Sequence, residues 1–468
     1  MNKTARNALI ALALVAALVC GFLTGCGTPA SPGGDGETTR VPPAQDTGLT
    51  LNIFQPHQSR AALWEELAAD YKALTGVTVA VRTSNTAKPA TELKEAFKED
   101  EGAPCLFFFT NPREHAAWKD NAADLIDTAA YQRLADRRLA LTVNDQVVGL
   151  PLAVEAYGII YNKKILNEYF NLSDKDTSFT GIADITSYKE LDELVKDLAA
   201  NKATLGLDGV FAAPAYKEGE SAAWSTRLLS VPVGYEMEQR KLGATGEEIN
   251  RLDLRYETGY HGFYDLHKGY GTTNEGLENR SYADAVREFA TGRAALVLGG
   301  TDFLGHLNSA VGRTVEAEDI AFLPAFMNIE EYKAQGLAFE VTEYAAINGK
   351  ADQEKIKAAG EFLNWLVTSE RGMDFLVNKL GLTAPYDNII ENAPPVNALA
   401  ADALGWLRKS EITNAVTYGV LSPGEEFRDK VLGTGLYDYH RGENTWDRFK
   451  ADLSAGWETH RARMEENW

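Results

Sequence analysis

The central part of the chain switches repeatedly between strand-like and helix-like hydrophobic patterns. Apolar and polar residues alternate over residues 49–53 and again over 77–81, which is typical of half-buried strands. Leu106–Phe109 are apolar at every position, which predicts a strand covered on both faces. Further strands are predicted at 158–161, 296–298 and 320–323.

Helical periodicity fills the stretches between these strands. One helix is predicted between an N-cap at Ser59 and a stop at Gly76. Ser187 and Glu190 have the spacing of a capping box and predict another helix start. Two later helices are predicted at 356–367 and 369–380. Strands that alternate with helices over this length indicate an α/β fold.

The first 26 residues have the pattern of an export signal. Lys3 and Arg6 precede an apolar run over residues 8–19, shorter than the roughly 18 to 20 residues that a membrane-spanning helix needs. The closing tetrapeptide Leu-Thr-Gly-Cys, which ends at Cys26, resembles the bacterial lipobox. It implies cleavage before Cys26 and a diacylglycerol on its thiol. An ordinary signal peptide that contains a cysteine is the alternative.

The next segment has no hydrophobic period. Residues 27–48 hold five glycines and four prolines, a composition that indicates a flexible linker. We therefore predict a lipoprotein signal peptide at 1–25 and a lipidated flexible tether at 26–48. The protein is expected on the cell surface, held by its lipid at the outer face of the bacterial cytoplasmic membrane, or on the periplasmic side if an outer membrane exists.

Charge and cysteine content narrow the possible partners. The 468-residue chain has 46 Lys and Arg against 67 Asp and Glu, a formal net charge of −21, so nucleic acid is not expected as a partner. Of three cysteines, Cys20 would leave with the signal peptide and Cys26 would be acylated. Cys105 is then expected to be a small buried residue without a disulfide partner.

The sequence contains no recognised motif for nucleophilic, zinc-dependent or phosphate chemistry. His261 and His267 are six residues apart, which on a helix directs them to different faces. We therefore predict no metal, no cofactor and no enzymatic activity. A secreted enzyme acting on cell-surface polymers is the alternative, because 67 acidic residues leave room for a catalytic pair.

Several blocks occur in a characteristic order. They read LNIF at 51–54, LTGVTV at 74–79, GLPLAVEAYGIIYNK at 149–163, FATGRAALVLGG at 289–300 and LGLTAP at 380–385. In this order they resemble the extracellular solute-binding proteins of carbohydrate ABC importers, the group related to maltodextrin-binding protein. The resemblance covers almost all of the chain after the tether, and the block at 149–163 is its most specific part.

The resemblance implies a two-lobed α/β fold of the periplasmic-binding-protein type, the Venus flytrap, with a solute held in the cleft between lobes. The chain would cross between lobes near 151–155, return near 323–326 and cross again near Pro385. Lobe one would comprise 49–152 with 325–384, and lobe two 153–324 with 385–468. The implied function is capture of an extracellular carbohydrate, with an oligosaccharide as first choice, for delivery to ABC transporter permease subunits by a monomer. A peptide, polyamine or iron ligand is the nearer alternative.

A sugar site needs charged or amide groups for hydroxyls and aromatic rings for C–H faces. Glu155 is the first candidate, because it matches the glutamate of the family's crossover segment. Trp224 lies where relatives place a ring. Asp302 and Phe303 lie where the family supplies a polar or aromatic contact. Asp302 stands where the maltodextrin protein has Trp, which puts maltodextrin specificity in doubt.

Other candidates follow predicted strands. His57 and Gln58 follow the opening strand. Asn111 and Arg113 follow the strand at 106–109, at the end where open α/β sheets bind ligands. The aromatic candidates are Tyr157, Tyr344 and Tyr386. Core packing is the alternative for the tyrosines, and a turn, cap or solvated loop is the alternative for the polar residues.

Overall fold

The computed structural model describes residues 44–99, 101–110, 112, 118–213, 222–242, 250–272, 280–418 and 424–466, without the side chains of 222–224 and 464–466. Residues 44–468 form one compact unit. The predicted signal peptide, Cys26 and most of the predicted tether lie outside the described residues. No helix in the described ranges is both long enough and apolar enough to cross a bilayer.

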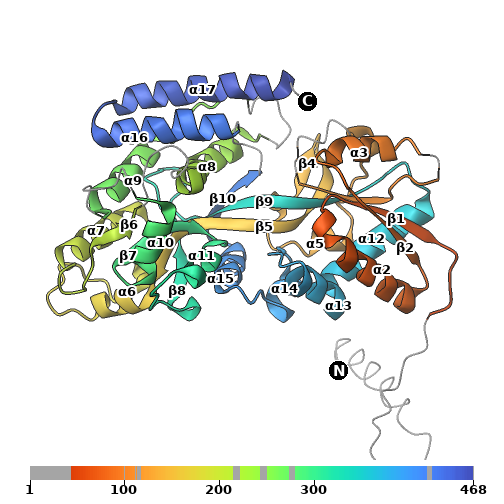
Figure 1. The fold of residues 1–468 in the computed structure, drawn as a ribbon, viewed down its shortest axis with the longest axis horizontal. Helices are drawn as coiled ribbons and strands as arrows, with labels where there is room; N and C mark the ends of the chain where they lie inside the picture. Colours follow the sequence, from red (N-terminus) through yellow and green to blue (C-terminus); the bar gives the residue numbers. More distant parts are fainter. Residues whose placement is uncertain are drawn as a thin grey trace, which may run out of the picture. The chain divides into compact units, whose positions relative to one another are not determined.

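Ten strands of the described chain form one mixed sheet (Figure 1). Its order is β2 (Thr78–Thr83), β1 (Thr50–Gln55), β3 (Leu106–Phe109), β9 (Gln335–Ile347), β5 (Gln146–Asn162), β7 (Ala294–Gly300) and β6 (Gly209–Ala212). The strands β4 (Leu141–Val143) and β8 (Ile320–Leu323) pair with β5, and β10 (Thr413–Tyr418) pairs with β9. The strands predicted from alternation are confirmed as β1 and β2, and the fully apolar run is confirmed as β3.

Two strands are much longer than the rest. β5 has 17 residues and β9 has 13, against about 5 to 6 in an ordinary strand. They pair antiparallel from Leu150 opposite Ala345 to Tyr157 opposite Ala338. One end of this pair adjoins β3 and β4, and the other adjoins β7, β8 and β10. β5 and β9 therefore run side by side from one half of the molecule to the other (Figure 1).

Each half has its own hydrophobic core. In lobe one, Trp64 of α2 (Ala61–Thr75) packs on Phe108, and α12 (Gln353–Thr368) covers the same cluster. In lobe two, α7 (Tyr188–Ala200) and α9 (Glu257–Tyr270) pack on β5 and β6. A third cluster, which includes Phe109, Val154 and Phe339, contains residues from both halves. The fold is thus the two-lobed α/β arrangement that was predicted.

The remaining helices cover these cores (Figure 1). They are α3 (Pro89–Ala96), α5 (Ala129–Gln132), α6 (Lys163–Phe170), α8 (Ala222–Arg240), α10 (Tyr282–Ala290), α11 (Phe303–Ser309), α13 (Glu370–Asp374), α14 (Asp387–Asn392), α15 (Ala398–Leu407), α16 (Thr434–Arg441) and α17 (Trp446–Glu466). In Figure 1, α16 and α17 lie side by side over lobe two. They contact each other, and Trp446 of α17 also packs on Tyr260 and His261 of α9, so both helices belong to the core of lobe two.

Helix starts are less well predicted than helix faces. The apolar face of α2 is buried as expected, and Gly76 ends the helix with a φ of 76°. Ser59, however, does not cap α2. It lies in a 3₁₀ turn at Gln58–Arg60, and the N-cap position belongs to Arg60. Ser187 does cap α7, accepting a hydrogen bond from the backbone N–H of Lys189.

The packing also bears on the predicted segment boundaries. Ala44 N–H donates to the carbonyl of Ala73 (2.9 Å) and Thr47 N–H donates to the carbonyl of Gly76 (3.1 Å), so this end of the predicted tether is bonded to the body, and its boundary at 48 stays a prediction. Phe326 and Ala338 pack in the core of lobe two, which favours a return crossing near 341–343 rather than 323–326. Tyr386 packs in the core of lobe one, which favours a third crossing after α14 rather than at 385. The lobe boundaries themselves stay a prediction.

Cys105 is confirmed as a small buried residue. Its side chain is 1% exposed and forms no disulfide. Burial raises the pKa of its thiol, because the thiolate would lose its hydration. The thiol therefore stays protonated and packs as a small apolar group.

The contact between β5 and β8 provides a test of the fold. A Cβ at Gly158 would lie 2.7 Å from the carbonyl oxygen of Leu323 and 2.9 Å from Leu337 Cδ2. Gly158→Ala should therefore lower the free energy of unfolding by roughly 1 to 3 kcal/mol, as measured in urea. Gly360→Ala on α12 is the matched control, because no atom beyond the helix's own nearby backbone and its chain neighbours lies within 4 Å of its Cβ position. Equal stability of the two variants would contradict this packing.

Candidate functional site

A network of charged side chains lies where lobe two meets the crossing strands. Arg227 of α8 donates from Nη1 to Asp302 Oδ1 (2.6 Å) and from Nη2 to Asp302 Oδ2 (3.2 Å). Its Nη2 also donates to Glu155 Oε2 (3.3 Å). One guanidinium thus joins a carboxylate at the start of α11 to a carboxylate in the middle of β5.

Local structure places each of these groups. Glu155 lies in β5 directly opposite Glu340 of β9. Asp302 follows β7, and the N–H of the preceding Thr301 bonds to the carbonyl of Ala156 (3.1 Å). Gly300 leaves room for the network, because a Cβ there would lie 2.8 Å from Asp302 Oδ1 and would also collide with the guanidinium.

The network has more negative than positive charge. Burial raises the pKa of Glu155, Arg227 lowers it in part, and Asp302 raises it again. Burial also raises the pKa of Glu340, and the neighbouring Glu155 raises it further. Glu340 makes no hydrogen bond or ion pair within the described part of the chain. Two carboxylates therefore bond to one guanidinium and a third, Glu340, lies beside Glu155, which gives these four groups a net charge of about −2 when all three carboxylates are ionised.

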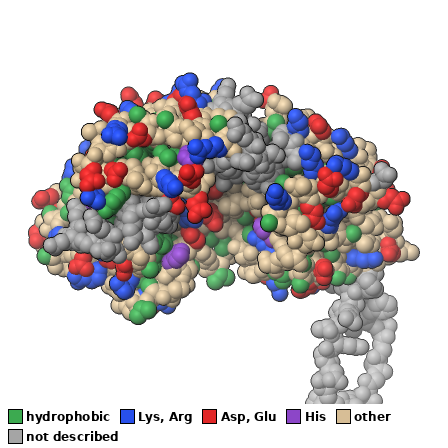
Figure 2. All heavy atoms as spheres, turned by 45° about the horizontal axis from the view of Figure 1, so that its top comes forward, with side chains coloured by type: hydrophobic (Ala, Val, Ile, Leu, Met, Phe, Trp, Pro, Cys, Tyr) green, Lys and Arg blue, Asp and Glu red, His purple; other side chains and the backbone are tan. Residues whose placement is uncertain are grey.

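A cavity of about 460 Å³ adjoins this network. Its lining comes from β5, from Thr301 and Asp302 of lobe two, from residues 377–383 of lobe one, and from residues 395–400. Asn397 Nδ2 donates to the carbonyl of Thr301 (2.9 Å), which fixes one wall. Val396 is 90% exposed and forms part of the lining. In Figure 2, acidic side chains gather beside the hollow between the two halves of the surface.

Lobe one supplies a second charged group beside the crossing. Arg60 Nη1 donates to Glu343 Oε2 (2.6 Å), and His57 Nε2 lies 3.7 Å from the same oxygen. Burial alone would raise the pKa of Glu343, but hydrogen bonds and positive charge from His57 and Arg60 hold it below its usual value. His57 is therefore used to orient Glu343, and the neighbouring Gln58 is exposed.

One further contact joins the two lobes directly. Arg138, which precedes β4 in lobe one, donates from Nη1 to Glu238 of α8 (3.3 Å) and to the carbonyl of Asn414 in β10 (3.2 Å). Asp136 holds the other side of the guanidinium. Helix α8 therefore contacts the crossing strand through Arg227 and lobe one through Glu238.

Four aromatic candidates are core residues. Phe303 and Tyr344 have no exposed surface, and Tyr344 stacks on Phe109 with ring centroids 5.2 Å apart. Tyr157 and Tyr386 are 4% and 2% exposed. Rings packed in this way offer no open face to a solute in this arrangement, and their role as ligand contacts stays a prediction. Of the other candidates, Asn111, Arg113 and the side chain of Trp224 lie outside the described residues.

Sequence reasoning missed Arg227 and Glu340. Arg227 lies one helical turn after Trp224, but its two carboxylate partners are 72 and 75 residues away in sequence. Glu340 and Glu343 were visible as charges inside an apolar stretch at 335–347, which is the signal that could have identified them. In the part of the chain that the structure describes, no group of three His, Cys, Asp or Glu side chains is arranged to hold a metal.

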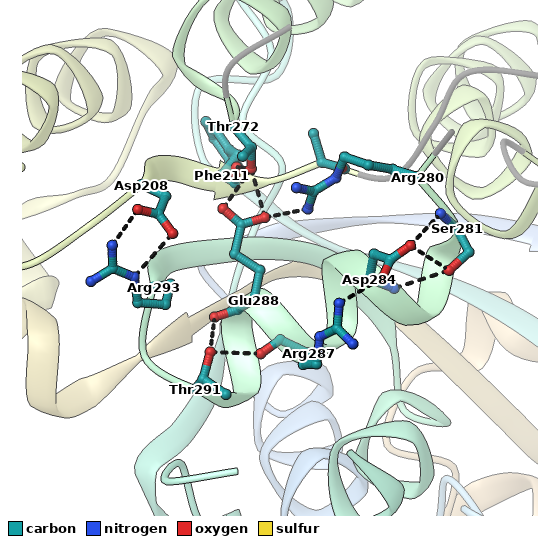
Figure 3. A network of polar contacts seen from close by, with 11 residues as sticks. Asp208, Phe211, Thr272, Arg280, Ser281, Asp284, Arg287, Glu288, Thr291 and Arg293 are labelled. Carbon is teal, nitrogen blue, oxygen red and sulfur yellow. Dashed lines mark hydrogen bonds and ion pairs between the residues drawn. The ribbon is translucent and has the colours of Figure 1, made fainter. Parts of the chain in front are cut away.

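A second polar cluster lies at the opposite end of β7. Glu288 of α10 is buried, accepts a hydrogen bond from Thr272 Oγ1 (2.6 Å) and pairs with Arg280 (Figure 3). Burial raises the pKa of Glu288, and Thr272 and Arg280 lower it in part. Arg287 and Arg293 pair with Asp284 and Asp208 in the same way. These contacts tie α10 to the residues that flank α9 and β6. The charges in the cluster balance pair by pair.

Two lobes joined by crossing strands, with a charged cavity at the crossing, define a protein that holds a solute between its halves. Residues 66–402 match the family model of bacterial extracellular solute-binding proteins. The chain belongs to this family. A search among proteins of curated function finds no significant match.

Solved structures support the same fold. A family 1 extracellular solute-binding protein from Bifidobacterium longum subsp. infantis has a TM-score of 0.60 at 16% identity, over 89% of this chain and 100% of that one. RafE from Streptococcus pneumoniae has a TM-score of 0.59 at 16% sequence identity, over 90% of this chain and 100% of that one. The cyclic alpha-maltosyl-1,6-maltose binding protein from Arthrobacter globiformis has a TM-score of 0.57 at 13% sequence identity, over 88% of this chain and 99% of that one.

The unpaired carboxylate in β9 provides a test of the site. Glu340→Gln should raise the free energy of unfolding at pH 7 by roughly 0.2 to 1 kcal/mol, because it removes a like-charge pair across two strands. Since the folded pKa of Glu340 is raised, the gain over wild type should vanish at acid pH and grow as pH rises through that pKa. Urea unfolding at several pH values measures this. Glu354→Gln, at an exposed site on α12, is the control. A destabilised Glu340→Gln would contradict the assignment.

Proposed function

We propose that this protein is a substrate-binding lipoprotein that captures an extracellular carbohydrate between its lobes and delivers it to an ABC permease. The single observation that supports this most is the Arg227 network, which brings Glu155 and Asp302 to a cavity at the crossing strands. Carboxylates and amides in a cavity suit the hydroxyl pairs of a sugar. The structural neighbour from Arthrobacter globiformis is itself a saccharide-binding protein by its printed name.

Binding would work by stabilising one arrangement of the lobes. Lobe one contributes residues 377–383 to the cavity and lobe two contributes Thr301, Asp302 and Asn397. A solute that touches both sets gains all its contacts only when the lobes are close together, so it shifts the population toward that state. The permease would then recognise the closed shape. No covalent step is needed, and we propose binding without turnover.

The location and partners follow the sequence. Acylation of Cys26 would hold the body near the outer face of the membrane, where the permease subunits are accessible. Residues 27–43 would remain as the flexible tether, since Ala44 and Thr47 are bonded to the body. We propose that the protein acts as a monomer, with each copy carrying a complete cavity.

Thermal unfolding with a solute panel tests the proposed function. Among neutral oligosaccharides, amino sugars, peptides, spermidine and ferric citrate, a saccharide should raise the Tm, because a ligand that binds only the folded state adds RT ln(1 + [L]/Kd). Glu155→Ala should weaken that ligand at least tenfold in calorimetry. The matched control is Glu354→Ala. A Tm raised only by peptide, spermidine or iron would contradict the carbohydrate assignment, and oligosaccharide cleavage during incubation would contradict a binding role.

A further inference from the structure

We infer that the solute carries a positive charge and is an amino sugar or an oligosaccharide that contains one. The inference rests on the proposed function and concerns the same cavity. It is carried by the balance of charge at the crossing strands, where Glu155 and Glu340 face the same side of β5 and β9, and the neighbouring cation Arg227 pairs with Glu155 but not with Glu340.

Glu155 and Glu340 lie directly opposite each other in the antiparallel pair of β5 and β9. Residues directly opposite each other in an antiparallel pair have Cβ atoms about 4.5 to 5.5 Å apart, and like charges there are destabilising. Glu340 interacts electrostatically with Glu155 and Arg227, but it forms no hydrogen bond or ion pair in the described part of the chain. A fold gains nothing from such a pair, so a second positive charge is the group that would complete it.

Arg227 is already bonded mainly to Asp302. Its shortest bond, 2.6 Å, goes to Asp302, and the second bond to Asp302 is 3.2 Å. Glu155 receives only the contact at 3.3 Å. The guanidinium therefore neutralises Asp302 first, and Glu155 with Glu340 keeps the surplus negative charge. About 42% of the Glu155 side chain is exposed, which leaves it accessible to a solute.

The rest of the polar cavity lining is uncharged. Besides Glu155 and Asp302, the polar lining consists of neutral hydroxyl and amide groups, from Thr301, Thr342, Thr383, Asn378 and Asn397. Hydroxyls and amides match the alcohol groups of a sugar, while a linear polyamine offers them few partners. The lining residues that the structure describes include no Lys and no Arg, so an acidic sugar would find no cationic partner among them and would be repelled by Glu155 and Asp302.

Calorimetry with matched disaccharides at pH 6.5 tests this inference. The probes are the β-1,4 dimer of glucosamine, its N-acetylated dimer, digalacturonate and spermidine. The glucosamine dimer should bind at least tenfold more tightly than the N-acetylated dimer, and digalacturonate should not bind. Glu340→Gln should reduce the preference for the free amine at least fivefold while the affinity for the N-acetylated dimer changes less than twofold. Glu354→Gln should leave every affinity unchanged.

The outcomes separate this inference from the proposed function. If both dimers bind equally, or the N-acetylated dimer or digalacturonate binds more tightly, the inference is overturned and the carbohydrate function stands. An amine preference that Glu340→Gln leaves intact also overturns the role of this carboxylate. If spermidine binds and no saccharide does, the carbohydrate function fails, and the inference of an amino sugar fails with it.

Discussion

The structure depends on the antiparallel pairing of β5 with β9. These two strands carry the chain from one hydrophobic core to the other. They pair from Leu150 to Tyr157 with an irregular register around Ala153, where the Val154 N–H bonds to the carbonyl of Thr383 instead. Backbone polar groups that are paired in this way satisfy each other at the point where the lobes separate. The crossing therefore remains ordered while each lobe keeps its own core, which is what a two-lobed binding protein requires.

Charged groups from both lobes collect at this crossing. Arg227 fixes Glu155 from the side of lobe two, whereas Arg60 and His57 fix Glu343 from the side of lobe one. Glu343 is balanced by the neighbouring Arg60, whereas no second cation balances the Glu155–Glu340 pair among the described residues. Like charges directly opposite each other across two strands are destabilising, and such compromises are expected at binding sites.

Hydrophobic pattern predicts the half-buried elements well and the crossing poorly. The faces of α2 and the alternation of β1 follow directly from residue periods. β5 is buried at nearly every position and therefore shows no alternation of apolar and polar residues. Only its last part, 158–161, was predicted as a strand, and its partner β9 was not predicted. The crossing came from family resemblance. Glu155 and Asp302 were predicted as site residues, but the Arg227 that bridges them was not. Arg227 is 72 residues from Glu155 and 75 residues from Asp302 in sequence, and no local pattern encodes contacts over that separation.

The central claim is that the two cores are rigid and that a solute changes only their separation. Small-angle X-ray scattering on the chain from Ala44 onward, which forms one compact unit, measures this directly when recorded with and without the saccharide that raises its Tm. The account predicts a smaller radius of gyration at saturating saccharide. The high-angle part of the profile, which reports the internal structure of the lobes, should stay unchanged. Identical profiles with and without a saturating ligand would contradict it.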